Sequence, residues 1–213
     1  MTAEARDPGD GGRTARKRRA ILEAARAEFL RHGFAGTSMD AVAARAEVSK
    51  QTIYKQFDDK ERLFTAIITM DIEKAEQRSQ ALVDALSDSE DVEKDLRALA
   101  RRHVSDVLQP HLVQLRRLVI AEADRFPDLA QAWYARGPER AATTLAERFT
   151  TLAEQGHLRM EDPVLAAQHF NWLVLSIPLN HAMFHPIGTQ FSPRQLRRFA
   201  DEAVRVFLAA YGS

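Results

Sequence analysis

The chain has 213 residues, which is enough for one large domain or two modest ones. Hydrophobic residues make up 45% of it and charged residues 28%, a globular balance that excludes a disordered or fibrous chain. The 30 basic and 30 acidic residues cancel, so the protein does not coat nucleic acid or membranes through bulk charge, and the lack of cysteine excludes disulfides and thiolate metal sites.

The charges are distributed unevenly along the chain. Residues 13–56 hold ten basic and four acidic residues, a net charge of +6, so the remainder carries −6. This division indicates a basic module joined to an acidic one. We expect residues 1–12 to form a disordered tail. Because the sequence shows neither an apolar leader nor an uninterrupted apolar span, we expect a cytoplasmic protein that does not cross a membrane.

Helical periodicity dominates the first third of the chain. Residues 13–32 place apolar side chains on one stripe, and His32-Gly33 supplies a stop. Two short helices are predicted next, one after Thr37-Ser38 and one after Ser49, because each serine can accept hydrogen bonds from first-turn amides. A long helix is predicted to follow, over residues 59–86.

Prolines divide the second half of the chain at places that fit helix ends or first turns, where a missing amide hydrogen costs least. These prolines are Pro110, Pro127, Pro138, Pro163 and Pro193. The predicted fold is therefore all-α, with nine or ten helices. We expect a small N-terminal domain over residues 13–58 and a larger helical bundle over residues 59–213.

Residues 163–184 form an unusual predicted helix, because at 100° per residue they present two opposed apolar faces. Such a helix must be covered on both sides, and a second subunit is the economical cover in a chain of this length. We therefore expect a homodimer, with either face of this helix at its interface. The candidate interface residues are Leu145, Phe149, Leu152, Phe170, Val174, Ile177 and His181.

The segment from Thr37 to Phe57 predicts a short helix, a tight turn and a second short helix, which is the anatomy of a helix-turn-helix. Val42 and Ile53 are suited to hold the two helices together. The second helix begins Lys50-Gln51-Thr52, so its first turn offers amide and ammonium groups to base edges, while later hydroxyls and lysines suit phosphates. The small N-terminal domain, with three helices, is predicted to bind double-stranded DNA.

A series of short motifs runs from Arg18 to Ile68. They are Ile21-Leu22-Glu23-Ala24-Ala25 with Phe29, Gly33-Phe34, Gly36-Thr37-Ser38, Val42-Ala43, Val48-Ser49-Lys50, Thr52-Ile53-Tyr54-Lys55-Gln56-Phe57 and Lys60-Glu61-Arg62-Leu63-Phe64. In order and spacing these motifs closely resemble the N-terminal domain of the TetR family of bacterial transcriptional regulators. The resemblance implies a regulator, acting mainly as a repressor, that binds an inverted-repeat operator as a dimer and leaves it when a small molecule binds.

The resemblance also assigns roles to individual residues. It implies contacts of Thr37 and Ser38 with phosphate, of Met39 with a thymine methyl group, of Lys50 and Gln51 with base edges, of Thr52, Tyr54 and Lys55 with the DNA backbone, and of Lys60 with a phosphate. Glu47 departs from the family, which usually has glycine in this turn. We expect it to hold a left-handed backbone at a cost of about 1 kcal/mol, or to rearrange the turn.

The C-terminal half looks like the corresponding domain of AefR-like members, on the segment from Arg117 to Leu129 with Gly137-Pro138 and Asp162-Pro163. That likeness implies dimerisation and ligand sensing. A sensor pocket needs apolar walls and a few polar groups, so we expect a small, largely apolar effector. The candidate effector-binding residues are Ile67, Met70, His103, Val107, Phe126, Trp133 and Trp172. A hydrogen-bonded core histidine, and plain core packing of the aromatic residues, are the alternatives.

Motifs for catalysis are missing from the sequence. It has no Gly-x-Ser-x-Gly elbow, no phosphate-cradling glycine loop and no recognisable Ser/His/Asp set, so we do not expect an enzyme. His181 and His185 have the spacing of metal ligands but lack the glutamate of a zinc-protease helix, and we expect neither a metal nor a cofactor. A helical-bundle enzyme and a protein-interaction module are the alternative functions.

Overall fold

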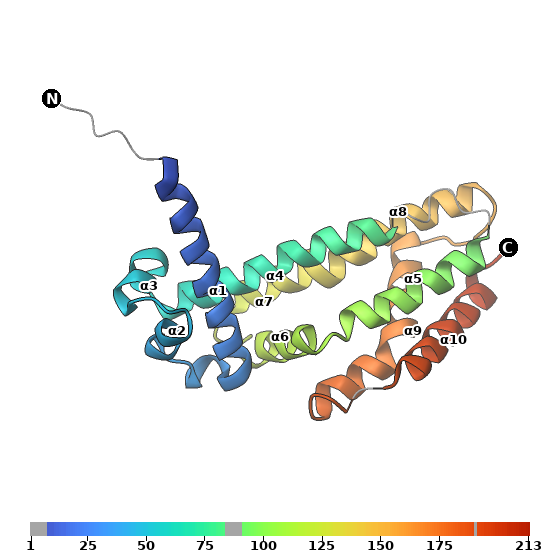
Figure 1. Ribbon diagram of the computed structural model, residues 1–213. Coiled ribbons are helices and arrows are strands. Elements are labelled where there is room, and N and C mark those ends of the chain that lie inside the picture. The colour runs from blue at the N-terminus through green and yellow to red at the C-terminus, as the bar shows by residue number, and fades with distance from the viewer. Residues whose placement is uncertain (1–7, 84–90, 190) are drawn as a thin grey trace. The chain divides into compact units, whose positions relative to one another are not determined.

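The computed structural model describes residues 8–83, 91–189 and 191–213, and every regular element within these ranges is helical (Figure 1). The predicted all-α fold is confirmed. Besides the helices, Leu158 and Gly212 form an isolated antiparallel bridge. None of the helices in these ranges combines the length and hydropathy needed to span a lipid bilayer.

Four helices form the N-terminal part of the chain. They are α1 (Pro8–Gly36), α2 (Met39–Arg45), α3 (Lys50–Phe57) and α4 (Lys60–Val83). Gly33 leaves helical geometry inside α1, with φ 69° and ψ 178°. Only glycine adopts such angles without steric cost, so the predicted stop at this residue is confirmed as a sharp break in the backbone.

The predicted tail over residues 1–12 is wrong for residues 8–12, because α1 already begins at Pro8. Proline is favoured in the first turn of a helix, where its missing amide hydrogen is not needed, and the alanines and basic residues after residue 12 are good helix formers. Residues 1–7 lie outside the described residues, as does the predicted end of α4 at residues 84–86.

Three phenylalanine side chains pack together in the core of the N-terminal unit. The rings of Phe29 and Phe34 stack with centroids 5.8 Å apart, and Phe64 of α4 meets them edge-on at 5.3 and 5.2 Å. All three side chains are buried, and edge-to-face packing adds to the stabilisation from burial. Other buried apolar side chains come from all four helices and include Ile21, Ala25, Val42, Ile53, Phe57, Leu63, Ile67 and Ile68.

The remaining helices are α5 (Val92–Val107), α6 (Pro110–Ala121), α7 (Pro127–Tyr134), α8 (Arg140–Glu154), α9 (Pro163–Phe184) and α10 (Pro193–Tyr211). Four of them begin with proline, which confirms the predicted role of these residues in first turns. Side chains of Asp162 and Ser192 cap α9 and α10 by accepting hydrogen bonds from Leu165 N and Gln195 N.

Pro138 behaves differently from the other prolines. It lies in η2 (Ala135–Glu139), a π-helical turn that joins α7 to α8 without a break. Predicted to fit a helix end or a first turn, Pro138 lies in the π-helical turn between the end of α7 at Tyr134 and the start of α8 at Arg140. In the wider turn Arg140 N–H donates to Ala135 O, five residues back, so the missing amide of the proline falls where the ordinary helical ladder is already interrupted.

The core of the C-terminal part also contains three phenylalanines. Phe149 of α8, Phe170 of α9 and Phe207 of α10 have ring centroids between 5.0 and 5.8 Å apart. Leucine, valine and alanine side chains from α5 and from these three helices fill the surrounding space. α5 supplies Leu96, Leu99, Ala100 and Val104 to this core, and α10 supplies Ala200, Ala203 and Val204.

Two compact units divide the chain, the N-terminal unit of residues 1–71 and the C-terminal unit of residues 72–213. The boundary predicted between residues 58 and 59 lies at the start of α4, whereas the units meet inside that helix, between Asp71 and Ile72. α4 therefore begins in the N-terminal unit and continues into the C-terminal unit.

Candidate nucleic-acid interface

α3 presents an exposed polar face in the N-terminal unit. Ser49 Oγ accepts a hydrogen bond from Thr52 N at 3.1 Å and so fixes where the helix begins. Ile53 and Phe57, four residues apart, are buried against the unit's core. This register leaves the opposite face exposed, and its side chains are Lys50, Gln51, Tyr54 and Lys55. Their ammonium, amide and hydroxyl groups suit base edges and phosphates.

Lys50 forms an ion pair that the sequence analysis did not predict. Its Nζ lies 2.9 Å from Asp40 Oδ2 of α2, and both side chains are largely exposed. The hydrogen bond to Asp40, together with the negative charge of that carboxylate, raises the pKa of the Lys50 ammonium. Lys50 is therefore held as a cation at the start of α3. The i, i+10 spacing of the two residues gave no signal, because only the turn between the helices brings them together.

The turn between α2 and α3 has the backbone expected for its unusual residue. Glu47 has a φ of 53°, in the left-handed region. Its N–H donates to Ala44 O at 3.3 Å, and the N–H of Val48 donates to Ala43 O at 3.1 Å. The hydrogen bonds of a tight turn are thus formed. The Cβ atom of Glu47 is sterically strained in this left-handed conformation, whereas glycine would not be.

Three of the predicted DNA contacts are engaged inside the protein. Met39 and Thr37 are buried, with 7% and 3% of their surface exposed, and Thr37 Oγ1 donates to Gly33 O at 2.8 Å. Ser38 caps α2 by accepting from Ala41 N at 3.1 Å. Met39 has little surface to offer a thymine methyl group, because it shares the inward face of α2 with Val42.

Lys60 also acts within the N-terminal unit. Its Nζ donates to Phe34 O and to Thr37 O, both at 2.9 Å, and lies 4.5 Å from the centre of the Phe34 ring. An ammonium group has three donors, and two of them satisfy carbonyls where the chain leaves α1. Lys60 therefore fastens the start of α4 to the loop before α2, and at most one of its donors is available to a phosphate.

His103 of α5 is the polar member of an otherwise apolar stripe in the C-terminal unit. Its Nε2 lies 2.8 Å from Asn171 Oδ1 of α9, and because an amide oxygen only accepts, Nε2–H is the donor. Burial lowers the pKa of His103, outweighing the opposite effects of the Asn171 hydrogen bond and the Asp106 charge. The ring is therefore held neutral, with its polar edge directed at α9.

The other predicted ligand-binding residues are divided among different neighbourhoods. Val107 packs against the C-terminal core, while Trp133 lies under the Arg116 guanidinium at 5.4 Å and Phe126 near that of Arg125, also at 5.4 Å. Trp172 lies on the exposed side of α9. Ile67 is buried and Met70 half-buried in the N-terminal unit. His103 and Val107 share one face of α5, and Ile67 and Met70 are spaced to share one face of α4.

The predicted dimer residues need correction. The side chains of Leu145, Phe149, Leu152, Phe170 and Val174 are buried in the core of a single chain, so they present no surface to a second copy. Of the two apolar faces predicted for α9, one is covered by α5, α8 and α10 of the same chain, and the other is exposed. Ile177 is exposed and His181 half-exposed.

His181 and His185 stack as parallel rings, with centroids 3.8 Å apart and planes inclined by 4°. Imidazole lone pairs lie in the ring plane, so two parallel stacked rings do not direct them at one point. His185 Nδ1 lies 2.9 Å from His181 O. Among the residues that the structure describes, no group of three or more histidine, aspartate or glutamate side chains is arranged to hold a metal ion.

Two family models match the chain. The family described as "Bacterial regulatory proteins, tetR family" matches residues 21–67, and "AefR-like transcriptional repressor, C-terminal domain" matches residues 94–213. A crystallised TetR-family regulator from Mesorhizobium loti is 41% identical, with a TM-score of 0.88 over 94% of this chain and 99% of that chain. The flavonoid-responsive regulator FrrA is 30% identical, with a TM-score of 0.71 over 93% of this chain and 98% of FrrA.

Curated relatives match over shorter segments. The HTH-type transcriptional regulator YhgD of Bacillus subtilis is 38% identical over 84 residues, which are 39% of this chain and 44% of YhgD. The HTH-type repressor SCO4008 of Streptomyces coelicolor is 48% identical over 48 residues, 22% of this chain and 25% of SCO4008. The chain thus matches less than half the length of these two regulators.

Proposed function

This chain belongs to the TetR family of bacterial transcriptional regulators, and from that membership we propose that it binds an inverted-repeat operator as a homodimer, represses transcription there and leaves when a small, largely apolar effector binds. The observation that carries the proposal is the exposed polar face of α3, capped by Ser49 and anchored by Ile53 and Phe57. Operator DNA lies with the bacterial chromosome, so we place the protein in the cytoplasm.

On α3 the proposed roles divide along the helix. Gln51, in the first turn, reads base edges in the major groove through its amide. Tyr54 and Lys55, further along, contact the DNA backbone, and Thr52 assists from its half-buried position beside Ser49. Lys50 contacts a base or phosphate only when it gives up its ion pair with Asp40, so Asp40 tunes the affinity of this contact.

A titration of DNA from upstream of the protein's own gene, followed by fluorescence anisotropy, tests these roles. Gln51→Ala should relax sequence preference, because a base contact is lost. Lys55→Gln should weaken binding to every sequence alike and reduce the slope of log affinity against log salt by about 1. Lys94→Gln, an exposed lysine of α5, is the matched control. Unchanged binding by both α3 variants would refute the assignment.

For the homodimer, we propose the exposed face of α9 as the shared surface. Leu165, Trp172, Leu173, Ile177 and Phe184 lie on one side of this helix, with 59% of Ile177 and 84% of Phe184 exposed. Large apolar side chains gathered on one exposed face mark an interaction surface, and a two-fold axis beside one helix buries the same face on both copies. The family resemblance of the C-terminal unit supports the same assembly.

Sedimentation of the Ile177→Glu variant tests this surface. Two buried glutamates facing each other across the two-fold axis should weaken dimerisation at least about tenfold, while the fold of each chain, read by circular dichroism, should persist. Ile120→Glu places the same charge on an exposed isoleucine of α6 and serves as the control. A dimer that Ile177→Glu leaves unchanged would contradict the proposed interface.

The effector is proposed to bind in the C-terminal unit, with the His103–Asn171 pair as its polar contact. The similar regulator FrrA responds to flavonoids, which supports an aromatic effector. Because α4 continues from one unit into the other, its displacement can carry the signal. Flavonoids are the first probes: a true effector must lower operator affinity and itself bind less tightly to the operator complex, by the same factor.

A further inference from the structure

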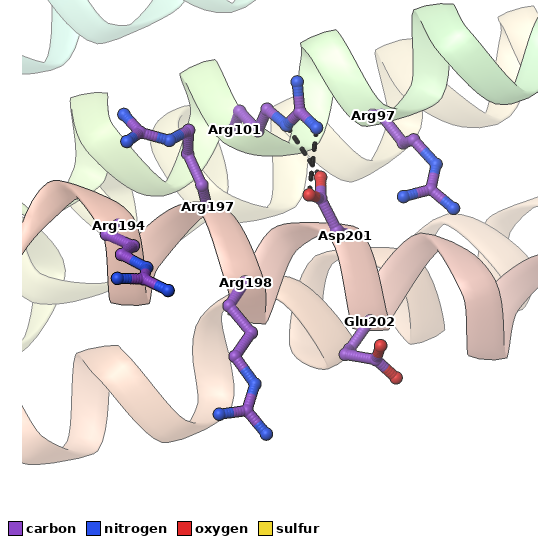
Figure 2. A pocket seen from close by; sticks show the side chains of 7 residues that line it. All are labelled: Arg97, Arg101, Arg194, Arg197, Arg198, Asp201 and Glu202. Atoms are coloured by element: carbon purple, nitrogen blue, oxygen red, sulfur yellow. Dashed lines mark hydrogen bonds and ion pairs between the residues drawn. The ribbon is translucent and has the colours of Figure 1, made fainter.

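A cavity lined by arginines lies between α5 and α10 of the C-terminal unit. Its volume is about 530 Å³, and its lining consists of five guanidinium groups and two carboxylates (Figure 2). The lining residues are Arg97 and Arg101 from α5, and Arg194, Arg197, Arg198, Asp201 and Glu202 from α10. The volume lies within the range typical of small-molecule sites.

Both carboxylates in the lining already have cationic partners. Asp201 accepts a bidentate pair from Arg101, with distances of 2.7 and 2.9 Å (Figure 2). That hydrogen bonding, with the charges of Arg101, Arg97 and Arg197, lowers the pKa of Asp201, so it is fully ionised at neutral pH. Glu202 accepts from Arg205 Nε at 2.8 Å. The two carboxylates are thus neutralised by Arg101 and Arg205. They do not need Arg194, Arg197 or Arg198 as partners.

Three arginines keep an uncompensated charge. Arg97 pairs with Glu93, at 2.9 and 2.6 Å, but in the part of the chain that the structure describes no ion pair within 4.0 Å engages Arg194, Arg197 or Arg198. Figure 2 shows Arg197 extending from α10 toward α5 and Arg198 extending the opposite way, with Arg194 nearer the start of the helix. A guanidinium is a planar fork that binds oxyanions through two parallel hydrogen bonds.

The position of these arginines on α10 is unfavourable for the helix alone. α10 begins at Pro193, so Arg194 lies in its first turn and the other two in the second, and the first turn holds no acidic residue. Cations at a helix N-terminus oppose the helix dipole. The spacings i, i+3 and i, i+4 from Arg194 also bring like charges together. A bound anion at this place would relieve both effects.

We propose that this cavity is a binding site for a small organic anion that carries two phosphate groups. Two phosphates carry about three negative charges near neutral pH, which matches the three uncompensated guanidinium groups. Arg197 and Arg198 hold the phosphates at the N-terminal end of α10, and Arg101, fixed by Asp201, lines the opposite wall. The site is separate from the proposed DNA and effector contacts and does not depend on them.

Calorimetric titration of the full chain with inorganic pyrophosphate, at constant ionic strength, tests the proposal. The wild-type chain should bind one pyrophosphate per chain in a saturable way, and Arg197→Gln with Arg198→Gln should weaken binding at least about tenfold. The matched control replaces two exposed arginines outside the cavity, Arg102→Gln with Arg159→Gln, and should bind as the wild type does.

Thermal melting separates loss of a site from loss of the fold. Without pyrophosphate the Arg197→Gln, Arg198→Gln variant should melt at or above the wild-type temperature, because repulsion at the start of α10 is removed. Replacing Arg197 and Arg198 with lysine keeps the charge but removes the bidentate guanidinium groups. The affinity of this variant for pyrophosphate should lie between those of the wild type and the glutamine variant. No saturable binding by the wild type, or equal affinity in the glutamine variant, would overturn the proposal.

Discussion

Each compact unit has three phenylalanines packed against one another in its core. They are Phe29, Phe34 and Phe64 in the N-terminal unit and Phe149, Phe170 and Phe207 in the C-terminal unit. The two units differ in what they leave on the surface. The N-terminal unit exposes the polar face of α3, whereas the C-terminal unit exposes large apolar side chains along α9 and arginines along α10. Similar cores thus support surfaces suited to different partners.

This comparison teaches which residues are free to carry function. On α3 the functional candidates are polar and the core residues apolar, so one helix separates the two sets by face. In the C-terminal unit both the core and an interface require apolar side chains. Burial within one chain, as for Phe149, therefore removes a residue from the surface, while Ile177 stays available to a second copy.

The largest expected effect tests whether the phenylalanines of the C-terminal unit are core or interface residues. Phe149→Ala should lower the free energy of unfolding by about 3–5 kcal/mol, since it empties a fully buried site among three helices. Urea unfolding followed by circular dichroism measures the change. Ile120→Ala, on an exposed isoleucine, should change stability by less than about 0.5 kcal/mol. Equal effects of the two substitutions would contradict the core assignment.

A smaller effect is expected at Lys60, where the N-terminal unit uses a lysine internally. Lys60→Met should destabilise the protein by about 2 kcal/mol, because Phe34 O and Thr37 O lose a charged donor. Lys94→Met, on an exposed lysine, should leave the urea midpoint nearly unchanged. If both variants unfolded at the wild-type urea concentration, the internal hydrogen bonds of Lys60 would not stabilise the N-terminal unit, and Lys60 would be a surface lysine free to bind phosphate.

Glu47 allows a prediction of increased stability. Glu47→Gly should stabilise the protein by about 1 kcal/mol, because glycine holds a φ of 53° without a steric penalty. Glu47→Ala removes the same carboxylate but keeps the penalty, so it should not stabilise. Both variants should bind DNA more tightly at low salt, through loss of negative charge. A stability gain in the alanine variant equal to that in the glycine variant would attribute the effect to charge instead.

The smallest effect concerns the pH dependence of the C-terminal unit. The pKa of His103 is lower in the folded chain than its unfolded value of about 6.5, so the unfolded chain takes up the proton first. The stability contributed by neutral His103 is therefore present above about pH 6.5 and lost as the pH falls below it. Urea unfolding at pH 7.5 and 5.5 should show a larger loss for wild type and for His157→Gln than for His103→Gln.

Much of the N-terminal unit was predictable from local sequence. Ser49, Ile53 and Phe57 together set the start and register of α3. For Glu47 the family resemblance left a left-handed backbone or a rearranged turn open, and the structure has the left-handed backbone. Met39, Val42 and Ala43 are spaced to share one helix face, and this periodicity predicts the burial that the structure shows for Met39. The family resemblance alone implied a base contact at this position.

In the C-terminal unit the missing information is tertiary. Apolar periodicity in α8 and α9 shows that side chains such as Phe149 and Phe170 are covered, but not whether the same chain or a second copy covers them. The arginine cavity depends on Arg101 meeting Asp201, 100 residues away. No local pattern specifies that pairing, because it follows from how α5 packs against α10.

The π-helical turn η2 sets the phase of α8. One residue of an α-helix advances about 100° around its axis, so the extra residue in a π turn rotates everything after it relative to α7. The stripe of Ala142, Leu145, Phe149 and Leu152 is buried in the core, whereas α7 has no buried residue. Deleting one residue from 135–139 would therefore turn α7 by about 100° relative to α8. A segment with no buried residue of its own thus determines which face α7 presents beside the core helix α8.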